Sequence, residues 1–345
     1  MSHHLESQSP FHSHFFGFLY RQWLLHRKPI PTGTTLSGQT AIVTGANSGL
    51  GFEAARQLLR VGLSHLIVAV RSQSRGDAAT QKLRREFPDS TISVWLLDMA
   101  SYDSVRAFAA RCRTLPRIDI VLLNAGVRSD YFELTESTHH EVAFQVNYLS
   151  TTLLAILLLP VLKSKKSSLP DARPPRLSIV TSDTAYWAPP LKTPGPIIAQ
   201  FDDPTDFVPM TSYSRSKLMQ QYFVSMLAEH VSPDDVIIST CNPGLCKATG
   251  FGHDATQGFI GSIIFWIFQN LNGRAVEVGT SAVVDAVVMK GKESHGSYVS
   301  DWTIQPYPVF FYTKEGQELR KRIWEETMEE FNFAGASQIV QEMKR

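Results

Sequence analysis

Short apolar runs alternate along the chain with longer segments that carry apolar side chains three and four positions apart. The apolar runs, rich in Val, Ile and Leu, occupy residues 40–43, 66–70, 92–97, 118–123, 177–180, 236–239 and 297–300. The segments with helical spacing occupy residues 52–59, 75–86, 102–112, 137–163, 214–230 and 274–289. Strands that are apolar on both faces are buried between helices. The pattern therefore predicts an α/β fold, a doubly wound parallel sheet with helices on both faces.

We place this alternation in a single domain, residues 37–345, after an N-terminal extension of residues 1–36. Two stretches inside the domain break the pattern. Residues 183–212 contain many prolines and are interpreted as a substrate loop. Residues 250–272 are apolar, and their central part, 258–271, is either a buried helix or a lid over a substrate pocket. Residues 302–345 form a C-terminal tail, whose aromatic residues weakly favour a hydrophobic substrate.

The N-terminal extension has a composition of its own. Its clustered histidines, His3, His4, His12 and His14, are typical of an unstructured terminus rather than of a metal site. The apolar run 15–20 is too short to span a bilayer. Aromatic residues within 11–28 share one helical face, with basic residues nearby. This segment either packs on the domain or a neighbouring subunit, or lies in a membrane interface.

Charge and cysteine content restrict the class of protein. The chain has 33 Lys and Arg against 32 Asp and Glu, which gives no reason to expect a nucleic-acid partner. Cys112, Cys241 and Cys246 have neither the spacing of a metal site nor that of a disulfide framework. We therefore expect no metal and a cytoplasmic location, with peripheral membrane contact as the alternative.

The apolar run 153–162 is too short to cross a membrane and is expected to pack against the sheet or a subunit.

A glycine-rich turn follows the first predicted strand. Its sequence is Thr44-Gly-Ala-Asn-Ser-Gly-Leu-Gly51, and a helical segment begins directly after it. Glycines let the backbone approach a pyrophosphate, and the free N–H groups at the start of the helix favour an anion. The turn predicts a dinucleotide site, although glycines also occur in ordinary turns.

Three residues further along the chain have the chemistry of proton transfer. Tyr213 and Lys217 are four positions apart in a predicted helix and project from one face. A nearby ammonium lowers the pKa of a phenol from its usual value of about 10, which suits the phenol to acid–base catalysis. Ser182 ends the fifth predicted strand, at the sheet edge where ligands bind, and its hydroxyl could hold a substrate carbonyl.

Taken together, these motifs resemble those of short-chain dehydrogenases/reductases over residues 38 to about 300. The motifs occur in the same order as in that family, and they are Thr44–Gly51, Asp98, Asn124-Ala125-Gly126, Asn147, Ser182, Tyr213-x-x-x-Lys217 and Asn242-Pro243-Gly244. Within the family the chain is most similar to the retinol dehydrogenase and WW-domain-oxidoreductase branch. Its tail is similar to that of fungal members, many of which belong to secondary-metabolite pathways.

The resemblance implies a Rossmann-like seven-stranded sheet and a nicotinamide cofactor. It places Gly45, Asn47, Ser48, Gly49, Leu50 and Gly51 at the pyrophosphate, Asp98 at the adenine, Asn124, Ala125 and Gly126 at the ribose side, and Pro243 and Gly244 at the nicotinamide. Tyr213 and Lys217 would also contact the cofactor, and Asn147 would hold a water that relays protons to Lys217. The segment between Ser182 and Tyr213 is longer than in compact family members, so the family's substrate pocket is not carried over.

The end of the second predicted strand indicates which nicotinamide cofactor is used. An NAD enzyme of this fold usually has an acidic residue there, which accepts a hydrogen bond from the ribose 2′-hydroxyl. Here Val70 takes that position and Arg71 follows it. A guanidinium can bind a 2′-phosphate through two charge-assisted hydrogen bonds, so the sequence favours NADP over NAD.

The sequence thus predicts an NADP-dependent oxidoreductase that interconverts a carbonyl and an alcohol on a small, hydrophobic molecule. Tyr213 would be the acid or base, Ser182 would polarise the carbonyl, and Lys217 would lower the tyrosine pKa. One alternative is a catalytically idle nucleotide-sensing protein, which would need none of Asn147, Ser182, Tyr213 and Lys217. Another is an epimerase or dehydratase, which the spacing from Gly45 to Gly49 disfavours.

Overall fold

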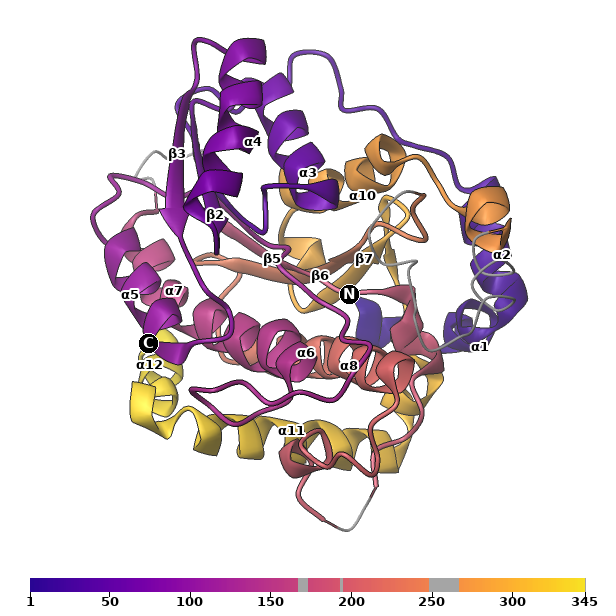
Figure 1. Ribbon diagram of the computed structural model, residues 1–345. Coiled ribbons are helices and arrows are strands. Elements are labelled where there is room, and N and C mark those ends of the chain that lie inside the picture. The colour runs from indigo at the N-terminus through magenta and orange to yellow at the C-terminus, as the bar shows by residue number, and fades with distance from the viewer. Residues whose placement is uncertain (167–172, 193–194, 248–266, 345) are drawn as a thin grey trace.

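The computed structural model describes residues 1–166, 173–192, 195–247 and 267–344 (Figure 1). At its centre is a sheet with the strand order β3-β2-β1-β4-β5-β6-β7-β8, in which every neighbouring pair but the last is parallel. The strands are β1 Thr40–Thr44, β2 His65–Val70, β3 Thr91–Leu96, β4 Ile120–Leu123, β5 Arg176–Val180, β6 Ile237–Asn242, β7 Ser297–Ser300 and β8 Thr303–Gln305. The predicted doubly wound parallel sheet of seven strands is confirmed, and β8 adds a short antiparallel edge strand.

Strand β8 was not predicted because it depends on an unusual turn. Asp301 and Trp302, the two residues between β7 and β8, have positive φ values of 53° and 60°. Two successive residues with positive φ form the kind of tight turn that joins antiparallel strands, and this turn usually contains Gly or Asn. The sequence therefore gives little local indication of the hairpin.

Two apolar cores lie on opposite faces of the sheet. Helices α3 Gly49–Arg60, α4 Gln73–Glu86 and α10 Val276–Val288 cover one face, at the top of Figure 1. Helices α5 Tyr102–Cys112, α7 Thr151–Ser164 and α8 Pro209–Leu227 cover the other face. The C-terminal tail forms an outer layer, in which α11 Lys314–Glu330 packs on α8 and α12 Ala336–Met343 packs on α7. The tail aromatics Tyr307 and Phe311 are buried in this layer and do not line the cavity described below.

The long helix predicted over 137–163 begins instead at Val142. Its start is fixed by Glu141, whose carboxylate oxygens accept hydrogen bonds from the N–H groups of Ala143 and Phe144, at 3.0 and 2.8 Å. It runs as α6 Val142–Phe144, a π-helical segment Gln145–Ser150 and α7. Of the residues described, Val142–Ser164 is the one helix whose length and apolar composition would suffice to cross a membrane, and 89% of its apolar window is buried inside the protein. Its burial fits the predicted packing against the sheet.

The N-terminal extension is folded onto the domain. It consists of η1 Ser2–His4, η2 Glu6–Gln8, α1 Ser9–Ser13 and α2 Phe15–Leu24. Ser2 Oγ donates a 2.6 Å hydrogen bond to the Gln305 carbonyl, and Ser9 Oγ donates one of 2.6 Å to the Tyr307 carbonyl. Both serines are fully buried. The expectation of an unstructured histidine-containing terminus is therefore wrong, because Ser2 and Ser9, on either side of His3 and His4, anchor it to β8 and the segment that follows.

The proline-containing segment 183–212 is attached to α11 by Glu326 and to the residue before α6 by Asp202, which accepts a hydrogen bond from the Glu141 N–H. It contains η4 Asp183–Trp187 and η5 Ile198–Gln200, and α8 begins at Pro209, a residue type favoured in the first turn. Glu326 Oε2 accepts hydrogen bonds from the N–H groups of Ile197 and Ile198, at 2.6 and 3.0 Å. In the segment predicted as an apolar lid, residues 267–272 are helical, and the greater part of the predicted lid lies outside the described residues.

Candidate active site

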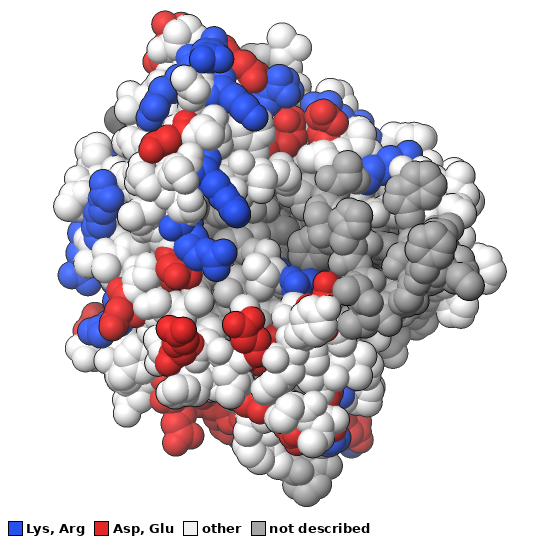
Figure 2. Space-filling view, viewed as in Figure 1, with Lys and Arg blue, Asp and Glu red and all other residues white. Residues whose placement is uncertain are grey.

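A cavity of about 1140 Å³ opens at the carboxyl edge of the sheet, beside the parallel neighbours β1 and β4, where the strand order switches from one side of β1 to the other. Its wall is formed by residues at the ends of β1, β2, β4, β5 and β6 and at the start of α3. Figure 2 shows this face hollowed near its centre, with basic side chains along the left of the hollow. Small-molecule sites usually have volumes of roughly 300–1,000 Å³, so the cavity has room for a dinucleotide and a substrate.

The glycine-rich turn forms one end of the cavity. Gly45 has a φ of +67°, which a residue with a side chain rarely adopts. A Cβ at Gly51 would lie 2.5 Å from both Asn124 Nδ2 and the Gly45 carbonyl oxygen, so only glycine permits this close packing. Helix α3 begins at Gly49 without a side-chain cap from Ser48. Its first N–H groups therefore stay available to an anion, and the turn fits a pyrophosphate.

The segment Asn124–Gly126 is fixed directly beside this turn. Thr44 Oγ1 accepts hydrogen bonds from the N–H groups of Asn124 and Ala125, each at 2.9 Å. Asn124 Nδ2 also donates a 3.0 Å hydrogen bond to the Thr44 carbonyl. A Cβ at Gly126 would lie 3.2 Å from Asn147 Oδ1 and 3.5 Å from Lys217 Nζ. The predicted ribose-side residues thus join the pyrophosphate end to the candidate catalytic residues.

The other predicted cofactor residues also line the cavity. Arg71 follows β2 with its side chain exposed, and Arg75 lies one helical turn further along α4. Among the residues that the structure describes, neither arginine has an ion-pair partner. Asp98 accepts a 3.0 Å hydrogen bond from the Ala100 N–H, which fixes its carboxylate at the cavity wall. Asn47, Ser48, Leu50, Pro243 and Gly244 line the cavity as well.

Ser182, Tyr213 and Lys217 meet at the centre of the cavity. Tyr213 and Lys217 come from α8, and Lys217 Nζ lies 5.7 Å from the centroid of the Tyr213 ring. Lys217 Nζ donates a 2.9 Å hydrogen bond to the Val180 carbonyl at the end of β5. The Ser182 side chain is hydrogen-bonded to Tyr213. The three predicted residues therefore form one constellation.

The electrostatics of this constellation differ from the prediction. Burial raises the pKa of Tyr213 to about 12, and the opposing influences come from the hydrogen bond with Ser182 and the charge of Arg128. Burial also lowers the pKa of Lys217 to about 7. The expectation that Lys217 lowers the tyrosine pKa is wrong, because burial dominates the shift and Lys217 is not among the groups that lower this pKa. Arg128, a cavity residue that the sequence analysis missed, supplies the positive charge instead.

Asn147 lies behind the cavity, in the π-helical segment. Its side-chain amide accepts a 2.8 Å hydrogen bond from the Val127 N–H and donates one of 2.8 Å to the Val127 carbonyl. Its own carbonyl accepts a 2.5 Å hydrogen bond from Gln220 Nε2. Asn147 thus fixes the loop after Gly126. The predicted water relay stays a prediction.

Six further residues border the cavity, and the sequence analysis did not single out any of them as a site residue. Phe15 and Phe18 come from the N-terminal extension, Asp183 and Trp187 from the predicted substrate loop, Leu245 from the segment after β6 and Phe268 from the predicted lid. An arginine and a glutamine in α2 hold these segments, as shown below. The indications in the sequence were the aromatic face of residues 11–28, the predicted substrate loop 183–212 and the predicted lid 258–271. In the described part of the chain, no group of three or more His, Cys, Asp or Glu residues is placed to hold a metal ion.

Comparison with known proteins identifies the family. The family model for short chain dehydrogenases matches residues 39–169. The short chain dehydrogenase virL of Hypocrea virens is 50% identical over 347 residues, which cover 100% of each chain. The chain belongs to the short-chain dehydrogenase/reductase family. The short chain dehydrogenase/reductase mfmJ of Annulohypoxylon moriforme is 48% identical, over 91% of this chain and 90% of its own.

Solved structures of the family support the fold. An NADPH-bound short chain oxidoreductase from Pseudomonas aeruginosa superposes with a TM-score of 0.56 at 22% identity, over 77% of this chain and 96% of its own. L-sorbose reductase from Gluconobacter frateurii, complexed with NADPH and L-sorbose, gives a TM-score of 0.57 at 19% identity, over 77% of this chain and 96% of its own. As a member of this family the chain is an oxidoreductase, and its resemblance to fungal members is confirmed.

Proposed function

We propose that this short-chain dehydrogenase/reductase uses NADPH to reduce a carbonyl group of a hydrophobic small molecule to an alcohol. The observation that carries the proposal is the meeting of Ser182, Tyr213 and Lys217 in a cavity whose far end is the glycine-rich turn. A nicotinamide bound there would supply a hydride to the substrate carbon.

Tyr213 carries the proton that reduction of a carbonyl requires. With its pKa raised to about 12, the phenol keeps its proton at neutral pH. A protonated phenol is an acid, and it can give that proton to a carbonyl oxygen as the carbon receives the hydride. The carbonyl then becomes an alcohol, and Tyr213 regains a proton from solvent. The Ser182 hydroxyl, hydrogen-bonded to Tyr213, would hold the same oxygen.

Lys217 is placed to serve the cofactor. Its ammonium already donates to the Val180 carbonyl, and an ammonium has further donors that could reach ribose hydroxyls. Since its pKa is about 7, part of the lysine population is uncharged at neutral pH. A bound ribose would favour the charged form, because it adds acceptors for the ammonium.

The choice of NADP over NAD rests on Arg71 and Arg75. Both border the cavity next to the end of β2, a position at which an acidic residue would select NAD. Neither has a carboxylate partner within the described residues, so both can bind a 2′-phosphate. NADPH complexes among the structural neighbours agree with this preference.

The sensor hypothesis remains the rival, since nucleotide binding does not by itself require turnover. One experiment distinguishes carbonyl reduction from nucleotide sensing. Purified protein and NADPH are mixed with a set of aldehydes and ketones, and both NADPH binding and the loss of reduced-nicotinamide absorbance are followed. Steady NADPH consumption with matching alcohol formation supports the proposal. Tight binding without consumption of any compound supports the sensor. A cytoplasmic location, with or without peripheral membrane contact, belongs to the proposal as well.

A further inference from the structure

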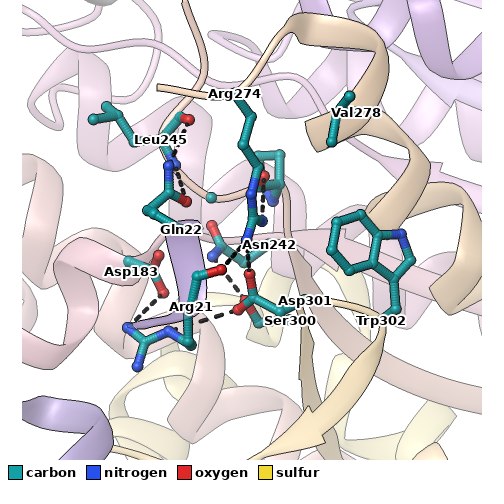
Figure 3. A network of polar contacts seen from close by, with 12 residues as sticks. Arg21, Gln22, Asp183, Asn242, Leu245, Arg274, Val278, Ser300, Asp301 and Trp302 are labelled. Carbon is teal, nitrogen blue, oxygen red and sulfur yellow. Dashed lines mark hydrogen bonds and ion pairs between the residues drawn. The ribbon is translucent and has the colours of Figure 1, made fainter. Parts of the chain in front are cut away.

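Two adjacent residues of α2 are buried between the loops that border the substrate end of the cavity. Arg21 is 1% exposed and Gln22 is 7% exposed. Figure 3 shows Arg21 directed toward Asp183 and Asp301, and Gln22 directed toward Leu245. A buried guanidinium is costly unless it is paired, so two carboxylates around Arg21 mark a specific attachment of α2 to the domain.

The first attachment is to η4, the short helix that follows Ser182. Arg21 Nη2 lies 3.4 Å from Asp183 Oδ1, at the start of η4. At the other end of η4, Trp187 Nε1 donates a 2.8 Å hydrogen bond to the Ser13 carbonyl of α1. The N-terminal extension thus holds both ends of the element that begins next to Ser182.

The second attachment is to the loop after β6 and to Asn272, the last of the helical residues 267–272. Gln22 Nε2 donates hydrogen bonds to the carbonyls of Leu245 and Asn272, at 3.1 and 2.8 Å, and Gln22 Oε1 accepts one from the Leu245 N–H at 3.3 Å. Gly244 has a φ of +74°, and a Cβ there would lie 2.5 Å from Gln22 Oε1. The backbone therefore approaches α2 closely at the segment that the resemblance places beside the nicotinamide.

Between these attachments, aromatic rings form one wall of the cavity. Phe18 is 5% exposed, and its ring centroid lies 5.6 Å from that of Trp187 in an edge-to-face arrangement. Phe268 stacks against Phe18 at 6.3 Å and also contacts Phe15 at 6.3 Å. All four residues line the cavity. Such a wall offers ring faces and edges, which attract other aromatic rings beyond the effect of apolar area alone.

We propose that α2 is the outer wall of the substrate site, that Arg21 positions this wall and η4, and that the substrate is a carbonyl compound with an aromatic ring. The inference rests on the proposed carbonyl reduction and adds a substrate class to it. Phe18 and Trp187 are its specificity-determining residues. Arg21 is a positioning residue, because it acts through Asp183 on the element next to Ser182.

The test compares Phe18→Ala with Phe16→Ala. Phe16 is on the same helix but is 69% exposed and does not line the cavity, so it is the matched control. An aromatic aldehyde, 2-naphthaldehyde, and an aliphatic one, hexanal, are used with NADPH. Binding of 2-naphthaldehyde to the protein is measured by calorimetry, separately from turnover, and NADPH binding is measured for every variant.

We expect Phe18→Ala to weaken 2-naphthaldehyde binding and to raise its KM about tenfold, with little change for hexanal and none in NADPH binding. Phe16→Ala should match the wild type. Arg21→Lys keeps the charge but not the fork of the guanidinium, and it should lower kcat for both aldehydes with NADPH binding unchanged. Equal behaviour of the two phenylalanine variants, or no preference of the wild type for the aromatic aldehyde, would overturn the inference. Phe18-dependent binding without turnover would support the aromatic wall and overturn the carbonyl reduction instead.

Discussion

Lys217 Nζ donates its hydrogen bond to the Val180 carbonyl, at 2.9 Å, and both atoms are buried at the point where β5 ends beneath α8. The pairing puts the lysine where a cofactor ribose would pass between the strand ends and Tyr213. It also removes the ammonium from water, which is the cause of its lowered pKa of about 7. The charge of Lys217 therefore changes within the pH range of ordinary assays.

This titration predicts a pH dependence of cofactor binding. Below about pH 7 Lys217 is an ammonium with three donors, and above it the lysine becomes an amine that binds ribose hydroxyls less well. We expect the NADPH affinity of the wild type to fall by roughly tenfold from pH 6 to pH 9, in fluorescence titrations. In Lys217→Met the affinity should be weaker at pH 6 and should not fall further. An equal fall in both proteins would assign the titration to another group.

Arg71 is expected to set the preference between the two cofactors. A charge-assisted hydrogen bond is worth about 1.5–3 kcal/mol, so the wild type should bind NADP roughly 10- to 100-fold more tightly than NAD. Arg71→Ala should remove most of this ratio by weakening NADP binding, while NAD binding stays the same. Arg85→Ala, at an exposed position on α4 that does not line the cavity, is the control. If the ratio survives in Arg71→Ala, the 2′-phosphate is bound elsewhere.

Deprotonation of His140 should lower the free energy of unfolding in mild alkali. Its ring nitrogens lie 2.8 Å from Asp202 and 3.2 Å from Glu330, so it joins the proline-containing segment to α11. Burial alone would lower the pKa of His140, but its hydrogen bonds to the two carboxylates outweigh burial and raise the pKa to about 9. A raised pKa in the folded state stabilises the fold below the unfolded value of about 6.5, and the contribution is lost as the pH rises through 9.

Urea unfolding at several pH values measures this contribution. The wild type should lose about 1–3 kcal/mol of its free energy of unfolding between pH 7 and pH 9.5 through this residue. In His140→Gln the free energy should be lower at pH 7, and its difference from the wild type should shrink as the pH rises. A difference that stays constant with pH would show that His140 contributes through packing and not through its charge.

Arg21 is expected to stabilise the whole domain as well as the pocket wall. Arg21→Met would leave Asp183 without its cation inside the protein, and removing one partner of a buried ion pair costs about 3–5 kcal/mol. Urea unfolding monitors the loss. Arg27→Met, which removes an exposed charge from the same extension, should change the free energy of unfolding by less than about 0.5 kcal/mol. Similar stability of both variants would mean that α2 contributes little to the fold.

The sheet and the cofactor end of the cavity could be predicted because their determinants are local. The apolar strands, the glycines of the turn and Arg71 after Val70 are all recognisable within a few residues of sequence. Tyr213 and Lys217 share a helix face for the same reason. The spacing of these motifs then places them at one sheet edge, since parallel strands end on the same side.

The sequence analysis offered packing of residues 11–28 on the domain as one interpretation. It could not predict that α2 forms a wall of the cavity, because the residues that hold α2 there are remote in sequence. Arg21 and Asp183 are 162 positions apart, and neither residue shows in isolation that the other pairs with it. The aromatic face of residues 11–28 could pack on the domain or contact a membrane. These two roles need the same residues in the segment and differ only in what covers the face. The direction of the Tyr213 pKa shift was also predicted wrongly. The shift depends on how deeply the phenol is buried, and the spacing between Tyr213 and Lys217 contains no information on burial.

The most direct test of the account is the effect of Tyr213→Phe on turnover and on cofactor binding, measured on the same preparation. The substitution removes the hydroxyl that would donate the proton and keeps the ring. Acid–base catalysis contributes roughly 10²–10⁴-fold, so kcat for carbonyl reduction should fall by at least about 100-fold, while the dissociation constant of NADPH stays within about twofold of the wild type. Retention of more than a tenth of the wild-type kcat would contradict the role of Tyr213 as the acid.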